Sequence, residues 1–400
     1  MALSLDTSFD PEILQLPFYD EAHRNLARDI GVWCRERTEQ WEGVRQETPE
    51  QAGLRLVKEL AQSGWFRFLD PTSEEDAAAG DFRSLCLMRE ALAYAEDLAD
   101  FAFSIQALSA TPLLRHGSDE QKKRYLPGMA DGSLVGAFAV SEEEAGSDVA
   151  ALTLRAERTD DGYVLNGRKA WIANGSIAGL YCVIARTGEG SGPLGLTAFL
   201  VPADTPGARV LESVEPIAPR SFAHLAFEDC KVPHDAVLGK PGAGFVIAMD
   251  LLERFRMTVG AAAVGFARRA ADAALARVRT RPAYGGRLID LQLVKASLAD
   301  MEVKLNAASL LVTRAAWEAD RGNRRYPAHS SIAKLHATEA AQEIIDASVQ
   351  LFGAAGVVKD SLPERLYRQI RSLRIYEGTS EVQLLTIAGA LDMRRAALAK

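Results

Sequence analysis

The sequence predicts a mostly α-helical protein with a β domain in its middle. Residues up to about 133 repeat with a helical period, and residues 134–238 form short β-type runs between turn signals. From about residue 245 long alanine-rich stretches return to the helical period. We therefore expect an N-terminal helical domain (1–133), a middle β domain (134–238) and a C-terminal helical bundle (239–400).

The N-terminal part carries two helix signals. Leu26, Ile30 and Trp33 follow one another at spacings of four and three residues, which places them on one helix face. Ser118 with Gln121 is typical of a capping box, in which two side chains satisfy free backbone groups at a helix start.

The middle part reads as strands joined by tight turns. Asp161-Gly162 and Asn166-Gly167 are hairpin signals, and the runs LYCVIART, LTAFLVPA and AHLAFEDCKVP are rich in strand-forming residues. Trp171 lies in a strand that we expect to end at the Asn174-Gly175 turn. Its ring either packs in the core or on the sheet, or it forms a flat wall for a bound aromatic ring.

The C-terminal part predicts four long helices, over residues 245–280, 290–321, 327–355 and 380–399, and hence a bundle. Ser380 with Gln383 indicates a second capping box at the start of the last helix. Gly353 or Gly356 is expected to cap the end of the third.

Composition excludes several classes of function. A net charge of −8 disfavours nucleic-acid binding and a polybasic membrane anchor, and no run approaches 18 apolar residues. Six scattered histidines and four distant cysteines predict no metal site, no disulfide framework and a cytoplasmic location. The glycines at 190, 192 and 195 match a dinucleotide motif by spacing, but a strand follows them, so we interpret them as a loop.

Several polar residues have both a structural and a functional interpretation. Arg256, three residues after Glu253, either makes a surface pair or serves a ligand among apolar neighbours. Arg281 either complements a helix C-terminus or binds an anion. Glu377 lies just before a helix start, where its carboxylate either complements the helix dipole or, if desolvated, acts as a general base.

Taken together, the order and spacing of these motifs resemble the acyl-CoA dehydrogenase family over nearly the whole chain. Residues 141–148 (SEEEAGSD) are similar to the family pattern Thr-Glu-Pro-x-Ala-Gly-Ser-Asp, and residues 169–175 (KAWIANG) to Lys-x-Trp-Ile-Thr-Asn-Gly. Residues 281–285 and 350–354 follow two further family patterns, and residues 375–380 (IYEGTS) match the family signature without change.

The resemblance implies a middle β-barrel, a C-terminal four-helix bundle, a homotetramer or homodimer, and bound FAD. It also implies that Glu377 is the catalytic base and that Ser147, Glu253, Arg256 and Gly378 line the substrate site. The residues that it assigns to FAD are Phe138, Val140, Ser141, Gly146, Ser147, Trp171, Ile172, Ala173, Arg281, Tyr284, Gln292, Gln350, Gly353, Thr379 and Glu381, some of them reaching the FAD of a neighbouring subunit.

The implied reaction is the α,β-dehydrogenation of an acyl thioester, with acyl-CoA as the expected substrate, to a trans-2-enoyl thioester. Electrons would pass to an electron-transfer flavoprotein or another acceptor. Ala173 and Ala354 depart from the family pattern, where threonine and glycine are usual. The alternatives are a dehydrogenase or oxidase of a thioester on a carrier protein, a flavin monooxygenase, and a non-catalytic binding relative, against which the presence of Glu377 argues.

Overall fold

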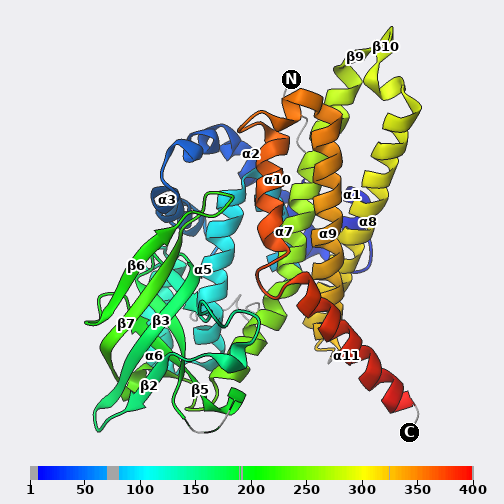
Figure 1. The fold of residues 1–400 in the computed structure, drawn as a ribbon. Coiled ribbons are helices and arrows are strands. Elements are labelled where there is room, and N and C mark those ends of the chain that lie inside the picture. Colours follow the sequence, from blue (N-terminus) through cyan, green and yellow to red (C-terminus); the bar gives the residue numbers. More distant parts are fainter. Residues whose placement is uncertain (1–7, 70–80, 189, 191, 324, 399–400) are drawn as a thin grey trace. The chain divides into compact units, whose positions relative to one another are not determined.

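A computed structural model describes residues 8–69, 81–188, 190, 192–323 and 325–398, and Figure 1 shows its helices and strands. The chain folds into two compact units, which are divided after Trp41, Gly80, Asp100 and Leu252. The last two of these divisions lie inside helices α5 (Asp97–His116) and α7 (Gly244–Thr280). The first unit takes in the described residues of Met1–Trp41, Asp81–Asp100 and Glu253–Lys400, and the second those of Glu42–Gly80 and Phe101–Leu252.

The first unit is helical. Besides parts of α5 and α7 it contains α1 (Pro11–Leu14), α2 (Glu21–Glu42), α4 (Phe82–Ala95), α8 (Gln292–Asp320), α9 (Tyr326–Phe352), α10 (Leu362–Leu373) and α11 (Ser380–Leu398). Helix α9 packs against α8, α10 and α11. The predicted long helices are therefore confirmed, while α10, which begins with a proline in its first turn, was not anticipated.

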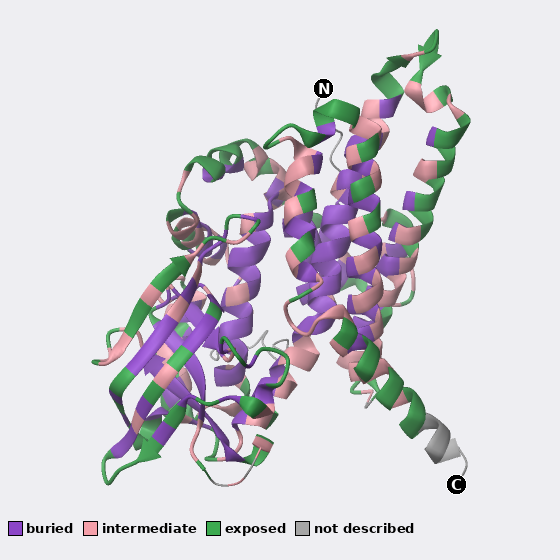
Figure 2. Cartoon of the chain, viewed as in Figure 1, coloured by how far each residue is buried: buried purple, intermediate pink, exposed green. Residues whose placement is uncertain are grey.

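Helix α7 is the buried centre of the first unit. Its residues from Phe255 to Phe266 are almost all buried, as the purple ribbon in Figure 2 shows. A helix that is buried on all sides needs small side chains where its neighbours approach closely. At Gly265 an added Cβ would lie 2.3 Å from the Glu90 carbonyl oxygen, so only glycine lets α4 approach this closely.

Two predictions concern residues at helix ends, and the structure tests both. Gly353 is the C-cap of α9 with a φ of 63°, as expected for a glycine cap. The capping box at Ser380 is wrong: the Thr379 hydroxyl accepts the Val382 amide at 3.3 Å, so Thr379 is the capping residue. The Gln383 side chain turns instead to the carbonyls of Glu377 and Gly378.

The second unit contains helices and one sheet. Its elements are α3 (Pro49–Gln62), α6 (Asp119–Ala130), β1 (Gly136–Ala139), β2 (Arg155–Arg158), β3 (Gly162–Ala173), β4 (Leu180–Arg186), β5 (Leu196–Pro202), β6 (Ala208–Val214), β7 (Phe222–Pro233) and β8 (Val237–Leu238), with parts of α5 and α7. The strand order is β6-β7-β3-β2-β4-β5-β8, and β1 pairs in parallel with β4. The capping box of Ser118 and Gln121 is present at the start of α6.

Turn chemistry in the sheet was predicted only in part. Asp161-Gly162 joins the antiparallel strands β2 and β3, as expected. Asn166-Gly167 makes no hairpin; it lies inside β3, where the register against β7 shifts. The Asn166 side chain is used there to accept the Asp229 amide at 2.8 Å, which stabilises a bulge in place of a turn.

Two composition-based expectations concern thiols and membranes. All four cysteines are buried and free. In the described part of the chain, none of the helices combines the length and apolar character that crossing a bilayer requires.

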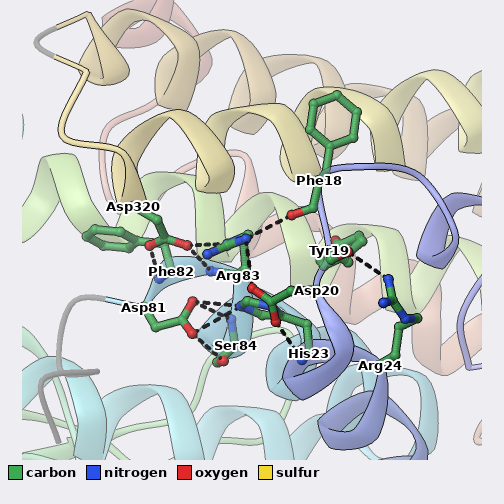
Figure 3. A network of polar contacts seen from close by, with 10 residues as sticks. All are labelled: Phe18, Tyr19, Asp20, His23, Arg24, Asp81, Phe82, Arg83, Ser84 and Asp320. Atoms are coloured by element: carbon green, nitrogen blue, oxygen red, sulfur yellow. Dashed lines mark hydrogen bonds and ion pairs between the residues drawn. The ribbon is translucent and has the colours of Figure 1, made fainter.

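A polar network fastens the N-terminal segment to the helices of the first unit (Figure 3). The buried His23 ring lies between two carboxylates, with Nδ1 2.6 Å from Asp20 and Nε2 3.1 Å from Asp81. Beside it, Arg83 donates to Asp320 at 2.6 Å and to the Phe18 carbonyl at 2.9 Å. Burial alone would lower the pKa of His23, but the carboxylates of Asp81 and Asp20 raise it.

The raised pKa of His23 gives a pH-dependent contribution to stability. A cationic histidine whose pKa is higher in the folded state stabilises the fold below its unfolded pKa of about 6.5, and this gain is lost as the pH rises through the folded value. We expect His23→Gln to lower the melting temperature more near pH 6 than near pH 9. Thermal unfolding at both pH values, with the exposed His234→Gln as control, measures this; an equal deficit at both would contradict it.

Candidate active site

Glu377 lies in a tight turn between α10 and α11. The turn is closed by hydrogen bonds from the Tyr376 amide to the Ser372 carbonyl at 3.1 Å and from the Ser380 amide to the Arg374 carbonyl at 3.2 Å. Glu377 has a φ of 54° and Gly378 a φ of 88°, and the left-handed region is costly for a residue with a Cβ. Such backbone strain in a non-glycine residue persists only where the surroundings impose it.

Two buried side chains impose that conformation. The Lys334 ammonium on α9 donates to the Gly378 carbonyl at 2.7 Å. The Gln383 amide on α11 donates to the same carbonyl at 2.8 Å and to the Glu377 carbonyl at 3.3 Å. Because both donors are fully buried, the position of the turn is fixed by α9 and α11 together.

Glu377 is half-buried, and one oxygen of its carboxylate is shielded from water. Its Oε2 atom is inaccessible to solvent and has no hydrogen-bond partner among the described residues. Burial raises the pKa of Glu377 to about 7, while the nearby cations Arg89, Lys334 and Arg256 pull it down. A carboxylate with a pKa near neutral pH is suited to accept a proton from a substrate and to release it again.

Two arginines next to the carboxylate are held in different ways. Arg89 on α4 makes a two-pronged ion pair with Asp100, with both N–O distances at 2.8 Å, and donates to Thr258 at 3.0 Å. Arg256 on α7 is buried, and its Nε has no partner among the described residues. The prediction that Arg256 is not simply an exposed side chain is confirmed. Burial lowers the pKa of Arg256, and the charge of Glu253 acts in the opposite direction.

The other predicted site residues of the first unit lie in two places. Gly378 adjoins Glu377, Thr379 caps α11, and Glu381 is exposed in the first turn of that helix. The remaining residues are exposed and cluster where α7 ends and α9 ends, with the Arg277 guanidinium 5.7 Å from the Phe352 ring; they are Arg281, Tyr284, Gln292, Gln350 and Gly353.

The two places are far apart within the unit. The 24 residues from Arg256 to Thr280 span about 36 Å of helix, at about 1.5 Å for each residue. Tyr284, which is 94% exposed with a φ of 46°, lies in the hairpin of β9 (Pro282–Ala283) and β10 (Gly286–Arg287) beyond that helix end. Residues near Arg281 and residues near Glu377 of one first unit therefore cannot touch the same flavin ring.

In the second unit the predicted residues meet beside β3. The Ala170 amide donates to the Ser141 carbonyl at 2.9 Å, and Lys169 Nζ donates to the Val140 carbonyl at 2.9 Å. Lys169 is buried and also pairs with Glu142 at 2.9 Å. This ion pair holds the segment after β1 against β3.

The predicted residues near Lys169 differ in how far they are exposed. Trp171 is 52% exposed with a φ of 60°, so the interpretation of its ring as a core residue is wrong. Ile172, in contrast, packs in the core of the sheet, so it offers only its backbone to a ligand. The other predicted residues are Phe138, which is buried, Val140, Ser141 and Ala173, which are half-buried, and Gly146 and Ser147, which are exposed.

Sequence reasoning missed the residues that support Glu377. Lys334, Arg89 and Asp100 lie in apolar helical stretches, where a lone charged residue signals that a partner is present but does not identify it. Gln383 was assigned to a capping box, because its spacing from Ser380 fits that motif equally well.

The raised pKa of Glu377 predicts a stability cost that depends on pH. A carboxylate whose pKa is higher in the folded state costs nothing below its ordinary value; its cost grows as the pH rises from that value to about 7 and is constant above it. We expect Glu377→Gln to stabilise the protein at alkaline pH, by on the order of 3 kcal/mol at most, and to have little effect near pH 5.

Chemical unfolding of both proteins at several pH values measures this difference. The control is Glu302→Gln, which alters an exposed glutamate of α8. A stability difference that does not change with pH would show that the Glu377 carboxylate is solvated.

Comparison with known proteins places the chain among flavoenzymes. Models of the acyl-CoA dehydrogenase N-terminal, middle and C-terminal domains match residues 20–133, 137–230 and 242–391. The chain is 36% identical over 345 residues to a probable acyl-CoA dehydrogenase, FadE25, of Mycobacterium tuberculosis, covering 86% of this chain and 87% of that protein.

Solved structures share the fold. Butyryl-CoA dehydrogenase of Megasphaera elsdenii superposes with a TM-score of 0.85 at 29% identity, covering 93% of this chain and 98% of that one. A prolyl acyl carrier protein oxidase, AnaB, superposes with a TM-score of 0.84 at 26% identity, covering 93% and 99%. PigA, solved with FAD and proline, has a TM-score of 0.86 at 27% identity and covers 94% and 98%.

The residues present fit FAD, on which the family depends. The second unit displays the exposed Trp171 ring beside the Ser141 backbone, a surface suited to a flat heteroaromatic ring with polar edges. The exposed Arg281 supplies a guanidinium of the kind that binds phosphate groups. With the matched domains spanning most of its length, the chain belongs to the acyl-CoA dehydrogenase family of FAD-dependent oxidoreductases.

Proposed function

We propose that this protein catalyses the α,β-dehydrogenation of an acyl-CoA thioester to the trans-2-enoyl thioester, with Glu377 as the base. The observation that carries the proposal is the Glu377 carboxylate itself, whose Oε2 is buried without a partner and whose pKa burial raises to about 7. A carboxylate that had only to complement a helix dipole would need neither feature.

Proton removal falls to the side chain of Glu377. The α-proton of a thioester is weakly acidic, so the base must be ionised, free of water and close to the carbon. Burial provides the dry environment, and the nearby cations keep a fraction of the carboxyl ionised at neutral pH. The strained turn, held through Lys334 and Gln383, supplies the fixed position.

The same turn offers a donor for the charge that develops on the thioester oxygen. Among the described residues, the Glu377 N–H donates to no backbone carbonyl. An N–H aimed at a developing oxyanion is typically worth roughly 2.7–4 kcal/mol in the transition state. Gly378 follows directly, and its missing side chain leaves room for the thioester beside that N–H.

Bound FAD supplies the acceptor for the hydride that leaves the β-carbon. The protein itself holds the flavin ring and the substrate in position. We assign the ring-side surface to Trp171 with the backbone around Ser141, and the substrate side to Ser147, Glu253, Arg256 and Gly378. Thr379 and Glu381, next to the base, would contact FAD from the first unit.

We also propose that the active protein is a homo-oligomer, a tetramer or a dimer. The exposed residues around Arg281 lie too far along α7 to serve the FAD next to Glu377 of their own chain, so a neighbouring subunit's FAD is their natural partner. Helix α11 supports this with four exposed apolar side chains: Leu384, Leu385, Leu391 and Met393. The three-domain division at residues 133 and 238 and a cytoplasmic location stay predictions.

A second candidate substrate is a thioester carried on an acyl carrier protein. The likeness to a prolyl acyl carrier protein oxidase favours keeping it. The electron acceptor is proposed to be an electron-transfer flavoprotein, with oxygen as the alternative. Flavin bleaching by a panel of acyl-CoA thioesters under anaerobic conditions separates the two carriers, and peroxide release separates the two acceptors.

Replacing the base tests the reaction most simply. We expect Glu377→Gln to keep its FAD but to lose about 10²–10⁴-fold in the rate of dehydrogenation, the usual contribution of a general base. The measurements are the flavin absorbance of the purified variant and its turnover with the best thioester. Retention of most of the turnover would refute the assignment, and Glu302→Gln serves again as the control.

Replacing Arg281 tests whether the exposed residues around the end of α7 bind FAD. We expect Arg281→Ala to lose FAD more readily on dilution while the α-proton chemistry of the loaded fraction is unchanged. Flavin content and the rate of FAD release measure this, with Arg279→Ala, another exposed arginine at the end of α7, as the matched control. Unchanged FAD retention would remove Arg281 from the cofactor site.

A further inference from the structure

Strand β7 meets an irregularity on both sides at the same residue, His224. On one side, β3 has two residues between Lys169 and Ile172, whereas β7 has one residue between their partners Leu225 and Ala223. On the other side, β6 has one residue between Val210 and Glu212, whereas their partners Leu225 and His224 are adjacent in β7. Each neighbouring strand therefore carries one extra residue opposite His224, and such bulges redirect side chains.

The redirected side chains converge on the His224 ring. The Trp171 indole from β3 lies edge to face with it, with ring centres 4.5 Å apart and planes at 89°. From β6, Glu212 Oε1 lies 3.2 Å from His224 Nδ1. Three adjacent strands thus build a row of Glu212, His224 and Trp171, in which the half-buried His224 lies between two exposed side chains.

The second ring nitrogen of His224 has no ordinary partner. Nε2 is buried and makes no hydrogen bond with the described residues. The charged side chain that directly faces His224 is Glu212 on β6. Two exposed arginines, Arg168 of β3 and Arg209 of β6, lie opposite Ala226, two residues further along the same face of β7. The ring is thus held by one carboxylate and one indole.

We propose that His224 is a positioning residue that holds the Trp171 ring in place through this row. The role rests on the proposed function only in placing Trp171 against the flavin. The contact between the two rings exists in the second unit by itself, whichever ligand the indole meets.

Packing gives the row its role. An edge-to-face contact fixes the orientation of the two rings relative to each other, and a bulge alone would leave the exposed indole free to turn.

Aromatic substitution tests the packing of His224. His224→Phe keeps a flat ring against Trp171, whereas His224→Ala removes it. In the holoenzyme we expect His224→Ala to release FAD about two- to ten-fold faster, the range that an edge-to-face pair supplies, and His224→Phe to restore the wild-type rate.

The spectroscopic signature comes from Trp171. We expect His224→Ala to shift the tryptophan emission of the holoenzyme, and we expect no such shift in His224→Phe or when His224→Ala is added to Trp171→Phe. His234→Phe is the matched control, because it removes another histidine of the same unit, one that packs on Tyr163 rather than on a tryptophan.

The outcomes distinguish the row from the wider functional proposal. A tryptophan emission that is the same in His224→Ala and wild type, or FAD release that is the same in His224→Ala and wild type while Trp171→Ala accelerates it, would overturn the role of His224. A protein in which Trp171→Ala leaves FAD binding unchanged would overturn the placement of Trp171 against the flavin, although the emission shift would still depend on His224.

Discussion

A carboxylate that removes a proton from carbon must be kept from water without being made permanently neutral. Glu377 meets this requirement through opposing effects: burial favours the neutral acid, and the three nearby cations favour the ion. Arg89 is itself balanced by Asp100, so its charge reaches Glu377 only in part. The balance leaves the pKa of Glu377 near 7, where both protonation states are accessible.

The turn that carries Glu377 shows how this balance is maintained. A left-handed glutamate followed by a left-handed glycine is unfavourable, and it is stabilised by two buried donors on one carbonyl oxygen. Lys334 serves both the backbone and the charge balance, because its ammonium clamps Gly378 and also acts on the carboxylate. The second unit uses a comparable device, since the buried Lys169 holds the Val140 carbonyl and the Glu142 carboxylate beside Trp171.

The sequence was sufficient for the helix and strand pattern and for the residues that lie in local motifs. Glu377, Gly378 and Trp171 were all identified from short segments, because turn glycines and aromatic strand residues leave local signals. Lys334, Asp100 and His224 left none, because each acts through a residue far away in the chain. The same limit explains Asn166-Gly167, whose hairpin signal is outweighed by the pairing of Asn166 with Asp229 on β7.

The protonation of the Glu377 carboxyl group can be observed directly. Carbon-13 NMR of protein labelled at the glutamate side-chain carboxyl, with Glu377→Gln to assign the signal, would follow that one group through a pH titration. The account predicts a midpoint near 7. A midpoint close to the ordinary glutamate value of about 4.3 would mean that water reaches the carboxylate, and the assignment of a desolvated base would be wrong.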